Sequence, residues 1–207
     1  MSVERLGVDE AVAALERGEV VALPTDTVYG VGALLSDARA VERLFEVKAR
    51  PRDVALPVLV GSLDDLDALG IEWTPQARTL AERFWPGALT IIVAAPAGLA
   101  TRVGSTGSVG VRWPRHEVLG EVLTRCGPLA VTSANEHGRP PCTSASDVMA
   151  TSWSAPVAGV LDAGPCDGEV SSVVELRGSR WWLRRAGAIG DEAIAAVLGP
   201  ESSTDDY

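Results

Sequence analysis

The sequence predicts an α/β domain in which helices cover a mixed sheet. Strand-like and helix-like segments alternate along the 207 residues, a pattern typical of α/β domains. Hydrophobic residues make up 46% of the chain, which is enough to build a substantial core. Several strand-like segments follow one another without a full helix between them, so we expect a sheet that is not purely parallel.

Short apolar runs bounded by turn residues predict the strands. They lie at residues 19–23, 56–60, 89–93, 109–112, 129–132, 157–161, 171–176 and 181–184. Arg177, Gly178 and Ser179 join the last two runs and predict a hairpin turn.

Helices are predicted where apolar residues recur at helical spacing behind a capping residue. Asp9 is expected to cap a helix that Gly18 ends, and Asp37 is expected to cap a second one. Thr74 followed by Pro75 gives a cap residue and then proline at the first helical position. Two more helices are expected, at residues 116–125 and 144–150.

The predicted domain covers residues 1–199. Residues 200–207 are polar and acidic, so we expect them to form a disordered tail. Apolar runs such as residues 89–95 are too short to cross a bilayer, and the first residues lack the apolar stretch of a signal peptide. These features predict a cytoplasmic protein with no membrane partner.

Charge and composition argue against several kinds of site. The chain has 18 basic and 28 acidic residues, a formal net charge of −10, which disfavours a protein whose main task is to grip a nucleic-acid backbone. Cys126, Cys142 and Cys166 are far apart in the sequence, and only two histidines accompany them. We therefore expect no zinc site or other structural metal, and thiols that are buried or inert.

Common catalytic and nucleotide-binding motifs are missing from the sequence. No GxxxxGK[ST] occurs, so the chain is not a P-loop enzyme, and Gly30-Val31-Gly32 lacks the third glycine of a dinucleotide fingerprint. There is no GxSxG elbow, and neither histidine is near an obvious nucleophile, which argues against a Ser-His-Asp arrangement.

Six polar clusters mark where a site could form. They are residues 24–30 (PTDTVYG), 48–52 (KARPR), 108–114 (SVGVRWP), 131–135 (VTSAN), 171–172 (SS) and 184–187 (RRAG). Each also fits an ordinary structural role, such as a capped turn, a cation that complements a helix dipole, or a surface ion pair. Together they supply cations and hydroxyls but no metal cage and no histidine base. That set suits a site that binds anions and stabilises transferred phosphoryl charge.

The order of these clusters resembles the YrdC-like family of L-threonylcarbamoyladenylate synthases. The matching segments begin with PTDTVYGVG at Pro24 and KARP at Lys48, and they extend to about residue 189. The others are FWPGALTII at Phe84, VGVRWP at Val109, TSANEHGRPPC at Thr132, SSVV at Ser171 and LRRAG at Leu183. The resemblance implies the short, single-domain form, with a twisted open sheet flanked by helices and a site in a concave cleft.

The resemblance also implies a reaction. The chain would be a nucleotidyltransferase that makes L-threonylcarbamoyl-AMP and pyrophosphate from L-threonine, bicarbonate and ATP, with Mg²⁺ accompanying the nucleotide. The product would feed N6-threonylcarbamoyladenosine formation at position 37 of tRNA, which a tRNA threonylcarbamoyl transferase complex completes, and any direct contact with tRNA would be weak. The alternative is a family member without synthase activity that binds a nucleotide or RNA.

Carried over residue by residue, the resemblance divides the candidates into two groups. Lys48 and Arg50 would be the catalytic residues. The implied ATP-binding residues are Lys48, Arg50, Ser108, Ser133 and Arg185, and the implied threonine-binding residues are Thr25, Arg112, Val131 and Ser171. Ala55, Leu59 and Pro141 depart from residues that many or some relatives carry, which puts the loop after Arg50 and two polar contacts in doubt.

Overall fold

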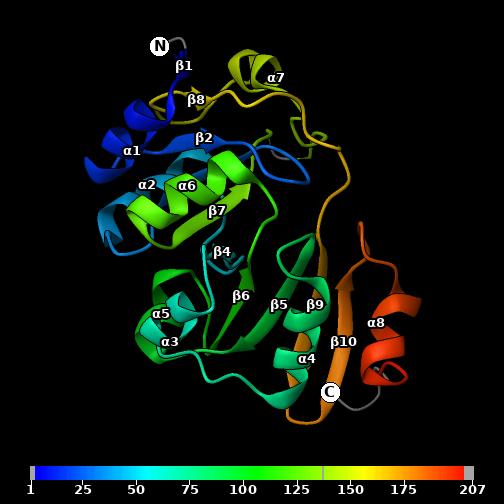
Figure 1. Ribbon diagram of the computed structural model, residues 1–207. Helices are drawn as coiled ribbons and strands as arrows, with labels where there is room; N and C mark the ends of the chain where they lie inside the picture. Colours follow the sequence, from blue (N-terminus) through cyan, green and yellow to red (C-terminus); the bar gives the residue numbers. More distant parts are fainter. Residues whose placement is uncertain (1–2, 137, 203–207) are drawn as a thin grey trace.

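A ten-stranded sheet runs through the part of the chain that the computed structural model describes, residues 3–136 and 138–202 (Figure 1). Its strands, in chain order, are β1 Arg5–Leu6, β2 Val21–Leu23, β3 Gly30–Leu34, β4 Val58–Leu59, β5 Leu89–Ala94, β6 Ser108–Arg112, β7 Leu129–Ser133, β8 Val160–Leu161, β9 Ser172–Arg177 and β10 Arg180–Arg185. Their order across the sheet is β1-β8-β2-β3-β7-β4-β6-β5-β9-β10.

The sheet is mixed, as the sequence predicts. Parallel pairs such as β4 with β6 and β5 with β9 alternate with antiparallel pairs such as β3 with β7 and β5 with β6. The sheet is also strongly twisted: in Figure 1, β2 lies across the view, whereas β9 and β10 run up it. The short strand β4 pairs with both β7 and β6 and so joins the two halves. The prediction of a twisted, open, mixed sheet flanked by helices is therefore confirmed.

Eight helices occur in the described residues, and they lie on both faces of the sheet (Figure 1). They are α1 Val8–Glu16, α2 Ala38–Val47, α3 Asp64–Ala68, α4 Pro75–Phe84, α5 Ala97–Arg102, α6 Glu117–Cys126, α7 Ala145–Ala150 and α8 Asp191–Leu198. None of these helices has the length and hydropathy that a membrane span requires.

Strand β2 shows how the sequence builds a core on each face. Because successive side chains of a strand point to opposite faces, Val21 and Leu23 lie in one cluster and Ala22 in the other. The first cluster also holds Leu15 of α1 and residues of α6, and the second holds Leu44 of α2. The strand is buried on both sides, which explains its unbroken apolar sequence.

Two of the predicted helix caps are confirmed. The Asp37 carboxylate accepts hydrogen bonds from the amides of Arg39 and Ala40 at 2.8 and 3.3 Å. The Thr74 hydroxyl accepts one from the amide of Ala77 at 3.2 Å, directly before Pro75. Each cap satisfies an amide that the first turn of a helix leaves without an intrahelical partner.

The predicted cap Asp9 is wrong. Helix α1 starts two residues earlier than an Asp9 cap implies, at Val8 behind Gly7, and Asp9 lies within its first turn. The Glu10 carboxylate accepts the Gly7 amide at 2.8 Å, the reciprocal contact of a capping box. Asp9 instead pairs with Arg125 of α6 at 2.8 Å.

Some elements were not predicted, above all β3, whose sequence GVGAL holds the glycine pair first compared with a nucleotide fingerprint. Its glycines permit close packing: a Cβ on Gly30 would lie 2.7 Å from Cγ1 of Val131. Near the C-terminus, the amide of Ser202 donates to the Trp181 carbonyl at 3.0 Å, and the Glu201 carboxylate accepts the Leu183 amide at 2.7 Å. These two residues of the expected disordered tail therefore bind β10, while residues 203–207 lie outside the described part.

Candidate functional site

A cavity of about 400 Å³ lies where the two halves of the sheet meet. Its lining includes eight of the nine candidate residues, namely Thr25, Arg50, Ser108, Arg112, Val131, Ser133, Ser171 and Arg185. On β6, Ser108, Gly110 and Arg112 recur every second residue, so they share one face of the strand. The fold thus brings together residues from both ends of the sequence, and among the candidates only Lys48 is not part of the described lining.

The turn that follows β2 is held by its own hydroxyls. Thr25 Oγ1 donates to the Val28 carbonyl at 2.8 Å and accepts the amides of Thr27 and Val28 at 3.0 and 3.2 Å. It also contacts Thr27 Oγ1 at 2.8 Å. Both threonines are buried. The Thr25 hydroxyl is therefore already engaged, and its main effect is to fix Thr27 and the backbone beside the cavity.

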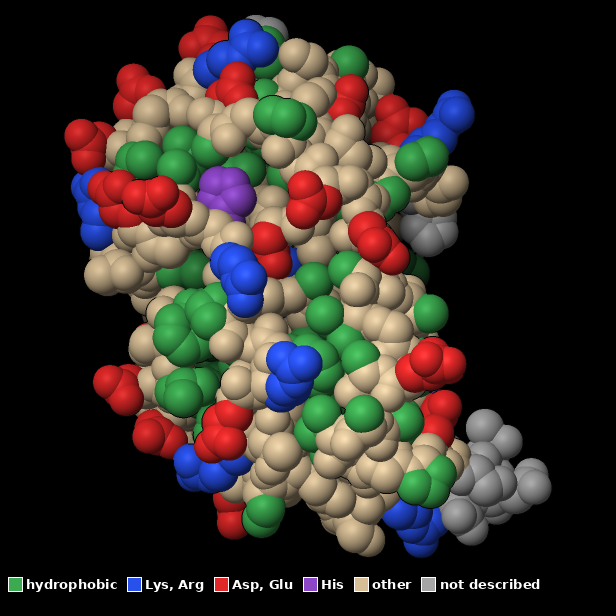
Figure 2. All heavy atoms as spheres, turned by 45° about the vertical axis from the view of Figure 1, so that its right-hand side comes forward, with side chains coloured by type: hydrophobic (Ala, Val, Ile, Leu, Met, Phe, Trp, Pro, Cys, Tyr) green, Lys and Arg blue, Asp and Glu red, His purple; other side chains and the backbone are tan. Residues whose placement is uncertain are grey.

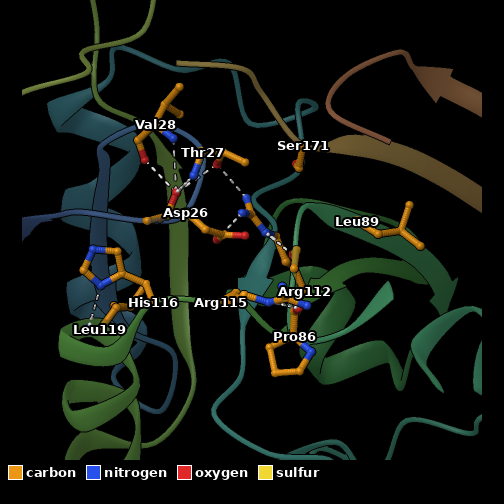
Figure 3. A network of polar contacts seen from close by, with 12 residues as sticks. Asp26, Thr27, Val28, Pro86, Leu89, Arg112, Arg115, His116, Leu119 and Ser171 are labelled. Atoms are coloured by element: carbon orange, nitrogen blue, oxygen red, sulfur yellow. Dashed lines mark hydrogen bonds and ion pairs between the residues drawn. The ribbon is translucent and has the colours of Figure 1, made fainter. Parts of the chain in front are cut away.

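Arg112 lies at the centre of a polar network (Figure 3). Its Nε donates to the Gly87 carbonyl at 3.0 Å, and one terminal nitrogen donates to Thr27 Oγ1 at 2.9 Å. The other terminal nitrogen pairs with Asp26 Oδ1 at 2.5 Å, in an ion pair whose side chains are only 7% and 14% exposed. Burial lowers the pKa of Arg112, while Asp26 opposes that shift. The guanidinium plane is thus fixed by three oxygens.

Helix α2 ends in a turn that directs Arg50 toward the cavity. The Arg50 amide bonds to the Phe45 carbonyl at 3.0 Å and the Ala49 amide to the Glu46 carbonyl at 3.0 Å, the pattern of a Schellman motif. Ala49 takes the left-handed conformation, with φ of 45°, that glycine usually supplies. The chain therefore reverses at Ala49, two residues before Pro51.

The Arg50 side chain is held only by uncharged oxygens among the described residues. Its guanidinium donates to the carbonyls of Val54 and Ala55 at 2.7 and 2.8 Å and to Thr132 Oγ1 at 3.3 Å. Burial lowers its pKa. The charge of Arg50 is thus oriented by the protein but not neutralised by it.

Asn135 links Lys48 to the cavity wall, and the sequence analysis did not single it out. Its Oδ1 accepts from Lys48 Nζ at 2.9 Å and from Ser133 Oγ at 2.7 Å. Lys48 Nζ also donates to the backbone carbonyl of Asn135. Burial, followed by the nearby charge of Arg50, lowers the pKa of Lys48 to about 8. Asn135 belongs to the polar VTSAN cluster, from which the prediction took only Val131 and Ser133 as site residues.

Arg185 and Ser171 form the opposite wall. The guanidinium of Arg185 donates to the carbonyl and to Oγ of Ser171, both at 2.9 Å. Thr90 Oγ1 lies 3.0 Å from Ser171 Oγ and adds a second hydroxyl to this chain of contacts. Burial lowers the pKa of Arg185, and the charge of Arg185 in turn lowers the pKa of Arg112. Two guanidinium groups therefore face one cavity and repel each other, as expected of a site that accepts an anion.

The charge of the site is local and does not extend over the molecular surface. No Asp or Glu belongs to the described lining, which contains Arg50, Arg112 and Arg185. On the face drawn in Figure 2, by contrast, acidic and basic side chains are mixed. The described residues include no group of three or more His, Cys, Asp or Glu that could hold a metal ion. Burial raises the pKa of all three cysteine thiols.

Known proteins resemble this chain in sequence and in fold. Residues 13–187 match the Sua5_yciO_yrdC family, described as "Telomere recombination". A protein of Mycobacterium tuberculosis (strain ATCC 25618 / H37Rv), named "Putative threonylcarbamoyl-AMP synthase", is 40% identical over 200 residues, covering 96% of this chain and 92% of its own. The "Threonylcarbamoyl-AMP synthase" of Bacillus subtilis (strain 168) is 39% identical over 92% of this chain, which spans only 56% of that relative.

Solved structures give the same result. The structure of P. abyssi Sua5 complexed with L-threonine superposes with a TM-score of 0.83, at 34% identity, over 95% of this chain and 60% of that one. E. coli YciO superposes with a TM-score of 0.80 at 19% identity, which supports the fold alone. Because the family match covers residues 13–187 and the relatives align over nearly the whole chain, this chain belongs to the Sua5_yciO_yrdC family.

Proposed function

We propose that this chain is an L-threonylcarbamoyladenylate synthase, which converts L-threonine, bicarbonate and ATP into L-threonylcarbamoyl-AMP and pyrophosphate. The observation that carries the proposal is a cavity of about 400 Å³ lined by three arginines and several hydroxyls but by no described carboxylate. Such a lining favours anionic ligands. The names of the relatives at about 40% identity support the same activity and give no support to a member without it.

Arg50, with Lys48 behind it, is proposed to bind the phosphates of ATP. Their partners in the described chain are neutral oxygens, so an entering phosphate would supply the missing negative charge. Ser133 shares Asn135 with Lys48, which supports a nucleotide contact for Ser133, and Ser108 lines the same cavity from β6. Arg185, on the opposite wall, would reach the nucleotide from the other side.

Arg112 is proposed to bind the carboxylate of threonine. Three of its N–H groups are used within the protein, and a guanidinium has five, so two remain for a ligand. Val131 is 6% exposed and lines the cavity, where it could pack against the threonine methyl group. Ser171 offers a hydroxyl from the facing wall of the same cavity, whereas Thr25 would act by holding the turn.

The proposed chemistry depends on placement. Threonine nitrogen adds to the carbon of bicarbonate with loss of water, and an oxygen of the resulting carbamate attacks the α-phosphorus of ATP as pyrophosphate leaves. Charge grows on the leaving pyrophosphate, and fixed cations such as Arg50 and Lys48 would stabilise it. Mg²⁺ would enter with ATP as part of the substrate, because the described lining offers no carboxylate ligand of its own.

The product would feed N6-threonylcarbamoyladenosine formation in tRNA by a separate transferase complex. The enzyme would then work in the cytoplasm, where its substrates are. The test is to incubate the purified chain with L-threonine, bicarbonate and MgATP and to search for the adenylate by mass spectrometry. We expect the adenylate and pyrophosphate in equal amounts, and neither in bicarbonate-free buffer. Pyrophosphate release that persists without bicarbonate would refute the proposed reaction.

A further inference from the structure

Asp26 supplies a counter-charge at the end of the site where Arg112 lies. Arg112 has a carboxylate partner, Asp26 Oδ1 at 2.5 Å, and the two side chains are 7% and 14% exposed. Within the described chain, the hydrogen bonds of Arg50 and Arg185 go to carbonyl and hydroxyl oxygens. Asp26 therefore offsets the charge of Arg112, whereas no described carboxylate offsets the charge of Arg50 or of Arg185, the guanidinium that acts on Arg112 across the cavity.

This difference affects which ligand each end prefers. A buried guanidinium with no counter-charge would attract any anion, and most strongly a polyphosphate. Beside Asp26, the Arg112 guanidinium can still donate its remaining N–H groups to a ligand. An anion bound there lies near the Asp26 carboxylate, which repels it. An amino acid carries one carboxylate and one ammonium and is neutral overall, so this repulsion is much smaller for it. Pyrophosphate and the ATP phosphates carry several negative charges and no positive one.

Asp26 is also held in place for this role. Thr27 and Gly87 bind the other nitrogens of Arg112, so the guanidinium cannot rotate away from Asp26 without losing three hydrogen bonds. Thr27 is itself fixed by Thr25 Oγ1. Figure 3 shows the Asp26 carboxylate directed at Arg112 from the turn that carries both threonines. The carboxylate is thus a fixed part of the Arg112 end.

We infer that Asp26 is a specificity-determining residue: it keeps polyphosphate away from Arg112 and reserves that end of the cavity for an amino acid. The inference rests on the proposed function, in which Arg112 faces the threonine carboxylate and Arg50 faces the phosphates. Without Asp26, pyrophosphate or ATP would bind across both ends and compete with threonine.

The test is the Asp26→Asn variant, which keeps the shape of the side chain and removes its charge. The affinity for L-threonine is measured by titration calorimetry, with and without saturating pyrophosphate. In the wild type, pyrophosphate should leave the threonine affinity unchanged. In Asp26→Asn, pyrophosphate should weaken apparent threonine binding about tenfold or more, since the repulsion that excluded it is gone.

Two control variants test whether the effect comes from the charge of Asp26, and not from its shape or from the loss of any carboxylate beside an arginine. Asp26→Glu restores the charge and should remain insensitive to pyrophosphate. Asp9→Asn makes the same change beside another arginine, Arg125, at 2.8 Å, but on a side chain that is 91% exposed. It should behave like the wild type.

Each outcome has one meaning. A wild type that binds no threonine refutes the proposed function, whatever the variants do. Competition by pyrophosphate in the wild type, its absence in folded Asp26→Asn, or equal competition in Asp26→Glu overturns the inference and leaves the proposed function standing. If melting curves show that Asp26→Asn does not fold, the wild type and Asp26→Glu decide: insensitivity of both supports the inference, and competition in either overturns it.

Discussion

Replacing Arg50 with alanine should damage ATP binding far more than folding. Arg50 uses three N–H groups on the Val54, Ala55 and Thr132 oxygens, which leaves two for phosphate oxygens. A hydrogen bond between a charged pair contributes about 1.5–3 kcal/mol, so the loss of one such contact should weaken ATP binding about 10- to 150-fold. The three oxygens left behind are neutral, and Val54 is 44% exposed, so water can replace much of what folding loses.

Arg52→Ala is the matched control. Arg52 comes from the same KARPR cluster, but it pairs with Glu42 and stacks on Phe45, 4.6 Å from the ring centre, and it is not part of the described cavity lining. ATP affinity by calorimetry, adenylate formation by mass spectrometry and thermal melting are measured for both variants. Arg50→Ala should lose affinity and turnover with a nearly unchanged melting temperature, and Arg52→Ala should retain both. Wild-type affinity in folded Arg50→Ala, or equal losses in the two variants, would refute the phosphate assignment.

Four further outcomes are expected. The pKa of Lys48 is lowered from 10.5 to about 8, so ATP affinity should fall as the pH rises through about 8 and Lys48 loses its charge. This pH dependence should vanish in Lys48→Ala. A wild-type ATP affinity that is flat between pH 7 and 9 would contradict the prediction. For the same group the unfolded chain binds more protons than the folded one between about pH 8 and 10.5, so its contribution to stability grows with pH in that window. Ala49→Gly should raise the free energy of unfolding in urea by up to about 1 kcal/mol, since relief of the left-handed strain at φ of 45° exceeds the entropy cost of glycine, and an unchanged or lower value would show that this turn carries no strain. Serine should replace threonine with kcat/KM at least about tenfold lower, because it lacks the methyl group that Val131 would contact, and valine should be worse still; equal rates with serine would remove Val131 from the specificity argument.

The structure changes how threonine recognition is explained. From the sequence, a hydroxyl of Thr25 or Ser171 is available to meet the hydroxyl of the substrate. In the structure, Thr25 Oγ1 already bonds to Val28 and Thr27, and Ser171 Oγ accepts from Arg185. We therefore expect selection for threonine to come from the apolar wall around Val131 and from any of these hydroxyl contacts that a ligand can replace. The resemblance could name these residues, but their existing partners come from tertiary contacts.

Local signals in the sequence were enough for most helices and strands. Asp37 and Thr74 cap their helices because a short polar side chain directly before a helix can accept hydrogen bonds from the free amides of its first turn. Strand β3 was missed because GVGAL has two glycines and lacks the bulky β-branched pattern of a strand. Those glycines are required by β7, whose Val131 packs where a Cβ would otherwise lie. The need for glycine at these positions comes from a residue about a hundred positions away in the sequence, so the residues around β3 do not indicate it.

The sequence by itself determined the α/β class, the family resemblance and the residue types of the site, because hydrophobic periodicity, cap residues and ordered polar clusters are local properties of a chain. It named eight residues that line one cavity. Only the tertiary structure decided which of their charges are compensated. Asp26 and Arg112 are 86 positions apart in the sequence, and Lys48 and Asn135 are 87 apart. Both pairs meet only because the twisted sheet brings β6, β7 and their adjoining turns together. The electrostatic character of a site depends on distance and burial, and a sequence specifies those two quantities only through its fold.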